Sequence, residues 1–182
     1  MTITGSRIAT PKVRTCSDDP MLMRKTLAQF PSGVVVLATE PDGQKHALVA
    51  SSFMVGVSLD PCLLAVAVQK SSETWASIKT SKSLGVSVFS QGQGGLTRQL
   101  ASKNRAARFE EVAVEVHDSG AVFIEDASLW FECAVYDELE AGDHWMVLLE
   151  VKQMGVSGNE PLIWHGAEFR DLAKNDTIAV KQ

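Results

Sequence analysis

The stretch of residues 45–74 constrains the fold more than any other part of the chain. It holds two apolar runs separated by the turn residues Leu59, Asp60 and Pro61. Apolar, β-branched runs bounded by turn residues are typical of buried neighbouring strands. Hydroxyl side chains gather at the ends of the runs, at Ser51, Ser52, Ser71, Ser72 and Thr74. The stretch therefore predicts a strand pair whose polar ends can face a ligand.

These hydroxyls allow two interpretations. Where a loop opens a helix, hydroxyls and backbone N–H groups can donate to the phosphate of a ring-shaped ligand. Ser71 or Ser72 can instead cap a helix that begins near Glu73, and Ser51 and Ser52 can mark a strand edge. The spacing alone favours the second interpretation, because Ser and Thr are common caps.

Short strands dominate the rest of the chain. β-branched or alternating runs predict strands over residues 34–39, 62–68, 84–89 and 112–116, and a long hairpin over residues 129–136 and 145–153. Residues 163–164 and Phe169 are expected to be short closing pieces. Since the helices are too few to alternate with the strands, the pattern predicts a mainly β fold, an antiparallel β-barrel with a few flanking helices.

Three helices are predicted around this barrel. The first follows Asp18 or Asp19, stops at Pro31 and is expected to pack an apolar stripe on the sheet. The second spans residues 73–80. The third follows a glycine-rich loop at residues 91–95, which lacks the G-x-G-x-x-G spacing of a dinucleotide fingerprint. The side chains expected to face the core are Met23, Leu27, Phe30, Trp75, Ile78, Leu96 and Leu100.

Length and charge predict one domain with small partners. The 182 residues suit a single domain over residues 18–174, with a flexible N-terminal arm at 1–17 and a C-terminal tail at 175–182. Seventeen basic residues against 22 acidic ones give a net charge of −5. This balance argues against binding to nucleic acid or an anionic membrane, and it favours a small molecule or another protein.

The cysteines and the apolar runs indicate where the protein is located and whether it binds a metal. Cys16, Cys62 and Cys133 are odd in number and far apart, unlike a zinc ligand set or a redox dithiol, so a reducing setting is expected. No H-E-x-x-H motif or Cys/His cluster predicts a metal. No apolar run is long enough for a bilayer, and the N-terminus lacks the order of a signal peptide. We therefore expect a soluble, cytoplasmic protein without a metal.

A set of short motifs, taken in chain order, resembles the flavin reductase family, the split-barrel oxidoreductases that often serve two-component monooxygenases. The motifs are FPSGVVV (30–36), HALVASSFMVGVSLDP (46–61), SSET (71–74), LGVSV (84–88), ASK (101–103), RF (108–109), WFEC (130–133), GDH (142–144) and PLIW (161–164). Together they cover about residues 20–172. The resemblance implies an FMN-binding split barrel with Greek-key-like antiparallel strands.

The resemblance also implies roles for particular residues. It implies a flavin ring lined by residues around Ala50, Ser51 and Ser52, and a flavin phosphate or ribityl chain near Ser71, Ser72 and Thr74. Lys103, in the ASK motif, either adds positive charge to the phosphate site or is an exposed helix-end lysine. His144, in the GDH motif, is expected to orient the nicotinamide cofactor by hydrogen bonding. Trp164 either encloses the nicotinamide pocket or lies in the core or a subunit contact.

Several positions depart from the family pattern. Ala47 and Val49 stand where Gly and Thr are frequent, Ser87 stands where Asn is frequent, and Leu149 replaces a common Gly. Val49 and Ser87 are therefore counted among the flavin-contacting positions, although Val49 cannot donate the hydrogen bond of a Thr. These departures bear on flavin affinity and flavin choice more than on the fold. Arg105 is interpreted as a solvated surface residue.

The leading functional hypothesis is an NAD(P)H-dependent flavin reductase that supplies free reduced FAD or FMN to a partner monooxygenase by diffusion. The cofactors bring the chemistry, so no side chain is expected to act as an acid, base or nucleophile. The alternatives are a non-catalytic flavin- or haem-binding split-barrel protein and an FMN-dependent oxidase of the same fold. The resemblance implies a homodimer. FAD or FMN, and NADH or NADPH, stay open at this point.

Overall fold

The computed structural model describes residue 16 and residues 19–172. Apart from Cys16, the predicted N-terminal arm lies outside the described residues, as does the predicted tail, so these domain boundaries stay predictions. In the described part, no helix is long and apolar enough to cross a membrane.

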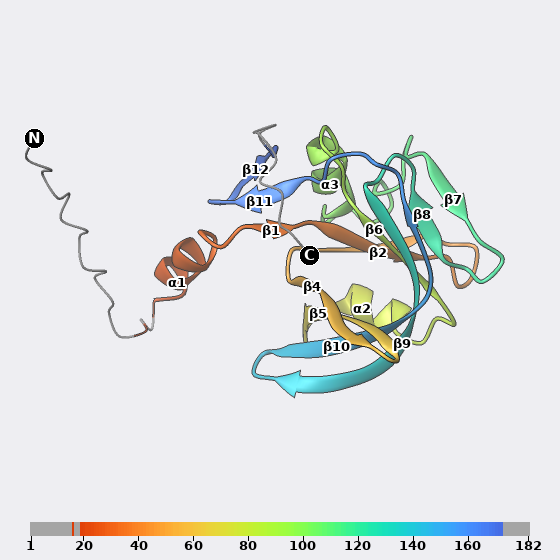
Figure 1. Ribbon diagram of the computed structural model, residues 1–182, viewed down its shortest axis with the longest axis horizontal. Coiled ribbons are helices and arrows are strands. Elements are labelled where there is room, and N and C mark those ends of the chain that lie inside the picture. The colour runs from red at the N-terminus through yellow and green to blue at the C-terminus, as the bar shows by residue number, and fades with distance from the viewer. Residues whose placement is uncertain (1–15, 17–18, 173–182) are drawn as a thin grey trace, which may run out of the picture.

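A seven-stranded antiparallel sheet forms the barrel (Figure 1). Neighbouring strands follow the order β3-β2-β6-β9-β10-β5-β4, and each pair is antiparallel. The β9–β10 pair confirms the predicted long hairpin, and β2 and β3 form a second hairpin. The bounds are β2 (Val35–Thr39), β3 (His46–Ala50), β4 (Phe53–Leu59), β5 (Cys62–Gln69), β6 (Leu84–Val88), β9 (Leu129–Ala141) and β10 (His144–Val156).

The sheet closes on itself at Ser51 and Ser52. Its two edge strands, β3 and β4, are consecutive in the chain and are joined by these two residues alone. The N–H of Ala67 in β5 donates to the carbonyl of Ser52 at 3.1 Å, and the Ser52 hydroxyl donates to the carbonyl of Ala67 at 2.8 Å. One apolar stretch therefore supplies both edge strands of the sheet, and the short link between them brings the two edges together.

Smaller elements flank the barrel. A three-stranded sheet contains β1 (Ser32–Gly33), β11 (Ile163–His165) and β12 (Glu168–Arg170), and a two-stranded one contains β7 (Val114–Val116) and β8 (Val122–Ile124). The helices are α1 (Pro20–Leu27), α2 (Glu73–Ile78) and α3 (Gly94–Leu100). The predicted mainly β fold with few helices is confirmed.

Strand β2 is buried on both faces and joins two apolar clusters. Val35 and Leu37 point into one cluster, which α2 closes with Trp75 and Ile78. The alternate side chains of β2 point into the second cluster, together with residues of α3 and β8 such as Leu100. A continuous β-branched run suits such a strand because neither of its faces meets water.

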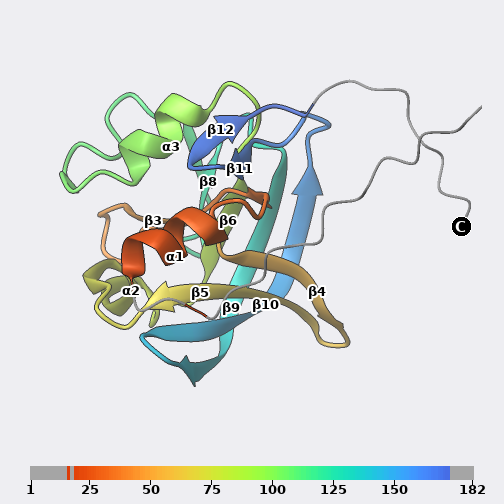
Figure 2. The ribbon, with the colours of Figure 1, turned by 90° about the vertical axis from the view of Figure 1, so that its left-hand side faces the viewer.

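The prediction that the first helix packs its apolar stripe on the sheet is wrong. No residue of α1 is buried, and Leu27 and Phe30 are 71% and 77% exposed. The sheet faces are already covered by α2 and α3, so α1 lies in front of the barrel, between the β11–β12 pair and the β5–β10 pair (Figure 2). The N–H of Gly166 holds it there by donating to the carbonyl of Ala28 at 2.7 Å.

Candidate ligand-binding cleft

Two hollows open where the sheet closes, and they share a floor. The first, named here the β3–β5 hollow, has a volume of about 300 Å³ and lies between β3, β5 and the start of α2. The second, the α1 groove, has a volume of about 660 Å³ and lies between α1, β4, β5 and β10. Both are lined by Ser51, Ser52, Ala67 and His144. Ligands in the two hollows would therefore lie side by side.

Small and apolar side chains make up most of this floor. Val49 and Ala50 line the β3–β5 hollow, Ala65 lines the α1 groove, and Ala67 lines both. Of the larger neighbours of Ala67 on β5, Val66 packs in the barrel core, and Val68 belongs to the same core cluster and also borders the β3–β5 hollow. A flat apolar ring can therefore approach the backbone of both strands, as is usual in cofactor sites.

The predicted hydroxyl residues are only partly brought together. Ser72 lines the β3–β5 hollow, but it is also the N-cap of α2, and its Oγ accepts from the N–H of Trp75 at 3.1 Å. The capping interpretation is therefore confirmed for Ser72. Ser71 is exposed on the preceding turn and does not line either hollow. Thr74 is buried and faces a separate recess.

Glu138 fixes the position of α2, and with it that of Ser72. Its carboxylate accepts from Trp75 Nε1 at 2.7 Å and from Lys79 Nζ at 2.9 Å. Burial raises the pKa of Glu138, but the hydrogen bonds from Trp75 and Lys79 outweigh burial, and the pKa lies below its usual value. The ionised carboxylate therefore ties the helix to the β9–β10 hairpin.

His144 stands at the meeting point of the two hollows. Its Nδ1 lies 2.7 Å from Oδ1 of Asp143. A hydrogen bond from His144, together with its charge, lowers the pKa of Asp143. Because this bond engages Nδ1, the other ring nitrogen, Nε2, is the atom that can meet a ligand. Trp164 lines the α1 groove with His144 and also packs edge-on against Phe169 at 5.1 Å between ring centroids.

A basic recess of about 210 Å³ continues from Ala47 at the other end of β3. Arg108 Nη1 donates to the carbonyl of Ala47 at 2.6 Å, which ties the loop after α3 to β3. Burial, then repulsion from Arg105, lowers the pKa of Arg108. Arg105 also forms a 2.6 Å ion pair with Glu73. The residues that line the recess are Gln44, Lys45, His46, Ala47, Thr74, Arg105 and Arg108.

Two of the predicted site residues lie elsewhere. Lys103 is exposed and does not line the recess, whose cations are Lys45, Arg105 and Arg108. Ser87 is fully buried, and its hydroxyl accepts from the N–H of Ile124 at 3.0 Å. Ser87 therefore holds β8 on the barrel and is not at the cleft, because its side chain points to the covered face of β6.

The sequence interpretation missed several lining residues. Ala67, Gln69 and Met146 carry no chemistry that would single them out, and they join the floor only through the β5–β10 pairing. Arg24 lines the α1 groove with Leu27. Their three-residue spacing, which places both side chains on one helix face, was the only available signal.

Known proteins match this chain over nearly the same residues that form the barrel. Residues 27–173 match the family described as the flavin reductase like domain. A flavin reductase from Pseudomonas putida is 33% identical over 156 residues, which cover 85% of this chain and 90% of that protein. The reductase subunit of a flavin-dependent monooxygenase from Rhodococcus jostii is 24% identical over 161 residues, which cover 88% and 82%.

The fold is also similar to that of a solved structure. The chain is similar to an NADH:FAD oxidoreductase from Streptomyces globisporus in complex with NAD and FAD fragments. The TM-score is 0.82 at 28% identity, and the match covers 87% of this chain and 96% of that one. The likeness therefore extends over nearly the whole barrel.

Proposed function

The chain belongs to the flavin reductase family, and on that premise we propose that it transfers a hydride from NADH or NADPH to FAD or FMN. The reduced flavin then diffuses to a partner monooxygenase. The observation that carries this proposal is the floor shared by the β3–β5 hollow and the α1 groove. Hydride transfer needs two flat rings in contact, and these adjoining hollows give each ring a place.

The lining of the two hollows fits a flavin and a nicotinamide. The small side chains Val49, Ala50 and Ala67 suit the flat flavin ring, and Ser51 and Ser52 supply backbone N–H groups to its polar edge. When bound, the flavin accepts the hydride and carries the redox chemistry. No side chain is required as an acid, base or nucleophile, so the residues act by holding the rings in register.

The basic recess is the place where we propose that the flavin phosphate binds. The recess starts at Ala47, three residues along β3 from Ala50, which is about 10 Å at the rise of a strand. Thr74 adds a hydroxyl, and Arg105 and Lys45 add charge suited to a phosphate. We assign the phosphate to this recess in place of Lys103.

His144 and Trp164 are proposed to hold the nicotinamide half in the α1 groove. His144 lines the shared floor, and its Nε2 can hydrogen-bond the carboxamide while Asp143 fixes the orientation of the ring through Nδ1. Trp164 supplies an apolar wall on the same side. Because the groove is wide and open to solvent, either ligand can leave after the transfer.

A steady-state assay tests the function directly. Oxidation of NADH and of NADPH is followed with FAD, FMN, riboflavin or no flavin added. We expect flavin to stimulate oxidation, and the pairings used identify the preferred donor and acceptor. No stimulation by any of the flavins would contradict the proposal. Anaerobic mixing of the flavin-loaded protein with NADH separates the non-catalytic and oxidase alternatives, since neither would show rapid loss of flavin colour.

Arg24 is proposed to bind the pyrophosphate of the nicotinamide cofactor. Among the described residues that line the two hollows, it is the sole lysine or arginine. It lines the α1 groove together with His144, the residue proposed to hold the carboxamide. Replacing Arg24 with glutamine is expected to raise the KM for NADH about 10-fold, the loss of one charge-assisted contact. The KM for flavin should not change.

Lys25 offers the matched control. It is the next residue of α1, is exposed, and does not line the groove. Lys25→Gln makes the same change in net charge, so it should leave both KM values unaltered. Equal effects of the two substitutions would show that only the long-range charge matters, and would reject a contact with Arg24.

We further propose that two copies of the chain form a homodimer. Large apolar side chains are exposed on or next to α1, on β4 and at the end of β10, and exposed apolar surface often marks a contact with another protein. Self-association through a two-fold axis is the commonest way to bury such a surface. The exposed residues are Met21, Leu22, Leu27, Phe30, Met54, Val55, Val57, Leu59, Met154 and Val156.

Sedimentation velocity tests the dimer. The expected species has twice the 19.7 kDa mass of the chain. Leu59 is 87% exposed at the end of β4, so Leu59→Asp should leave the fold intact and shift the protein towards monomer. A wild-type protein that sediments as a monomer at micromolar concentration would contradict the proposal.

We also propose a cytoplasmic location. The widely separated cysteines suit a reducing compartment, and burial raises the pKa of Cys133 to about 12, which makes that thiol unreactive. Nicotinamide cofactors and a diffusing reduced flavin would be available there.

A further inference from the structure

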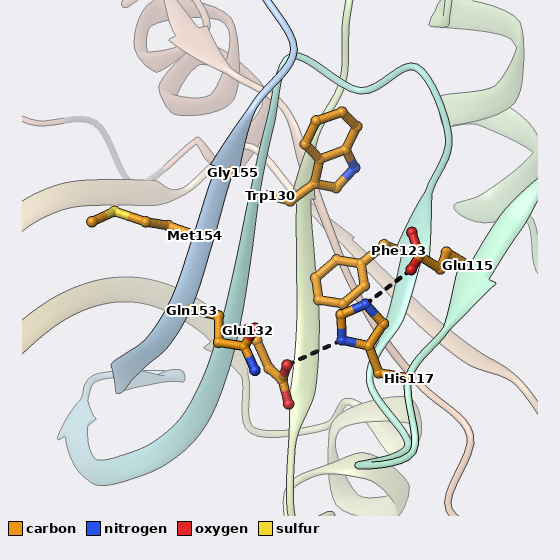
Figure 3. Close-up of a pocket in the computed structure, with 8 residues that line it drawn as sticks. All are labelled: Glu115, His117, Phe123, Trp130, Glu132, Gln153, Met154 and Gly155. Atoms are coloured by element: carbon orange, nitrogen blue, oxygen red, sulfur yellow. Dashed lines mark hydrogen bonds and ion pairs between the residues drawn. The ribbon is translucent and has the colours of Figure 1, made fainter.

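A third cavity lies away from the flavin cleft, between the β7–β8 pair and the β9–β10 hairpin. It has a volume of about 240 Å³, and its principal lining residues are Glu115, His117, Phe123, Trp130, Glu132 and Gly155. Figure 3 shows the rings of Trp130, Phe123 and His117 one after another beside the strands that carry Glu132 and Gly155. Gln153 and Met154 of β10 complete the lining.

The cavity holds negative charge without a matching cation. Glu132 is only 7% exposed, and its Oε1 accepts from the hydroxyl of Ser83 at 2.8 Å. Burial raises the pKa of Glu132, but hydrogen bonds from Ser119, Ser83 and His117 outweigh it and keep the pKa below its usual value. The carboxylate is therefore ionised, and its charge can attract a cation into the cavity.

His117 cannot supply that cation alone. Its Nδ1 lies 3.2 Å from Glu132 and its Nε2 lies 3.2 Å from Glu115, so two carboxylates share one imidazole. Asp118 borders an adjoining hollow that shares His117 and Glu132. No lysine or arginine lines either space in the described part of the chain. The side chain of Glu115 is 72% exposed and Asp118 is also exposed to water, so Glu132 is the carboxylate that a bound cation would compensate.

The walls select an organic cation over a metal ion. In the part of the chain that the structure describes, no group of three or more His, Cys, Asp or Glu side chains is arranged to hold a metal. The rings of Trp130 and Phe123 instead offer aromatic surface, which attracts ammonium groups by cation–π interaction. Gly155 leaves space beside the indole, since a Cβ there would lie 3.5 Å from Trp130 Cε3.

We propose that this cavity, named here the ammonium cavity, binds a small organic ammonium ion, with its charge near Glu132 and its alkyl body against Trp130 and Phe123. The site is separate from the flavin cleft, because the two share no lining residue. Its occupation therefore does not depend on the proposed reductase activity.

Calorimetric titration of the full chain with choline, in the absence of flavin and nicotinamide, tests the site. Choline is expected to bind, and its uncharged carbon isostere dimethylbutanol is expected to bind at least about 10-fold more weakly, since it lacks the cation. Absence of choline binding, or equal binding of the isostere, would overturn the proposal.

Two substitutions locate the binding. Gly155→Val fills the cavity with a residue that suits a strand, since the backbone of Gly155 is not in the left-handed region. Glu132→Gln removes the charge and keeps the bond to Ser83. Each should weaken choline binding about 10-fold or more and leave flavin reduction unchanged, while the exposed Glu160→Gln is the charge control. Wild-type affinity in a folded Gly155→Val protein would place choline elsewhere and reject the site.

Discussion

Replacing Gly85 with alanine is expected to destabilise the barrel strongly. A Cβ at this position would lie 2.2 Å from the carbonyl oxygen of Val122 and 2.7 Å from its carbonyl carbon, so β8 passes directly over the backbone of β6. Backbone atoms cannot turn aside as a side chain can. The methyl group would push β8 away and break the bond between Ile124 and Ser87. We expect the free energy of unfolding to fall by about 3 kcal/mol or more.

Urea denaturation measures this effect, with Gly95→Ala as its control. A Cβ at Gly95 meets nothing within 4 Å, and the residue lies within α3. Alanine there should raise the stability by up to about 1 kcal/mol, because it favours the helix over the unfolded chain. If Gly85→Ala unfolds at the same urea concentration as the wild type, the close contact between β6 and β8 is wrong.

The strands were predictable because their residues are β-branched and stop at turns. Strand β2 is the clearest example, since Val35 and Val36 point to opposite faces and both meet apolar clusters. The hydroxyls at Ser51 and Ser52 indicated that a strand could end there, and the structure places the link between β3 and β4 at these two residues. The sequence could not show that Ser52 bonds to Ala67, a contact between residues distant in sequence.

The exposed position of α1 has a similar cause. The stripe that includes Leu27 and Phe30 has the spacing of a packed helix, and sequence spacing cannot tell which surface covers it. The sheet faces are already filled by α2 and α3. The same stripe would suit contact with a second copy of the chain, as proposed above.

The candidate site was predictable only where a residue type carries chemistry. His144 and the hydroxyls at Ser51 and Ser52 stood out, and the structure brings them to one floor. Ser87 has the same chemistry, but β6 turns it to the covered face, where it serves β8. Ala67 lies in the middle of the floor, although its methyl group gives no sign of a role.

A substitution at Ala67 therefore tests most directly whether the cleft binds the flavin ring. Its side chain lines both hollows, while its backbone N–H and carbonyl bond to Ser52 in the link between β3 and β4. A phenylalanine would place its ring where the flavin is proposed to lie, without entering the core that Val66 and Val68 fill. We expect kcat/KM for flavin to fall about 100-fold, since small displacements of reacting rings are costly.

The control for this loss is Ala76→Phe, which adds the same volume at an exposed position of α2. Both variants should unfold near the wild-type temperature, because neither added ring enters a buried cluster. Only Ala67→Phe should lose activity and flavin binding together. A folded Ala67→Phe protein that still reduces flavin at the wild-type rate would mean that the ring does not rest on β5. The reductase activity would then have to be located in a different part of the barrel.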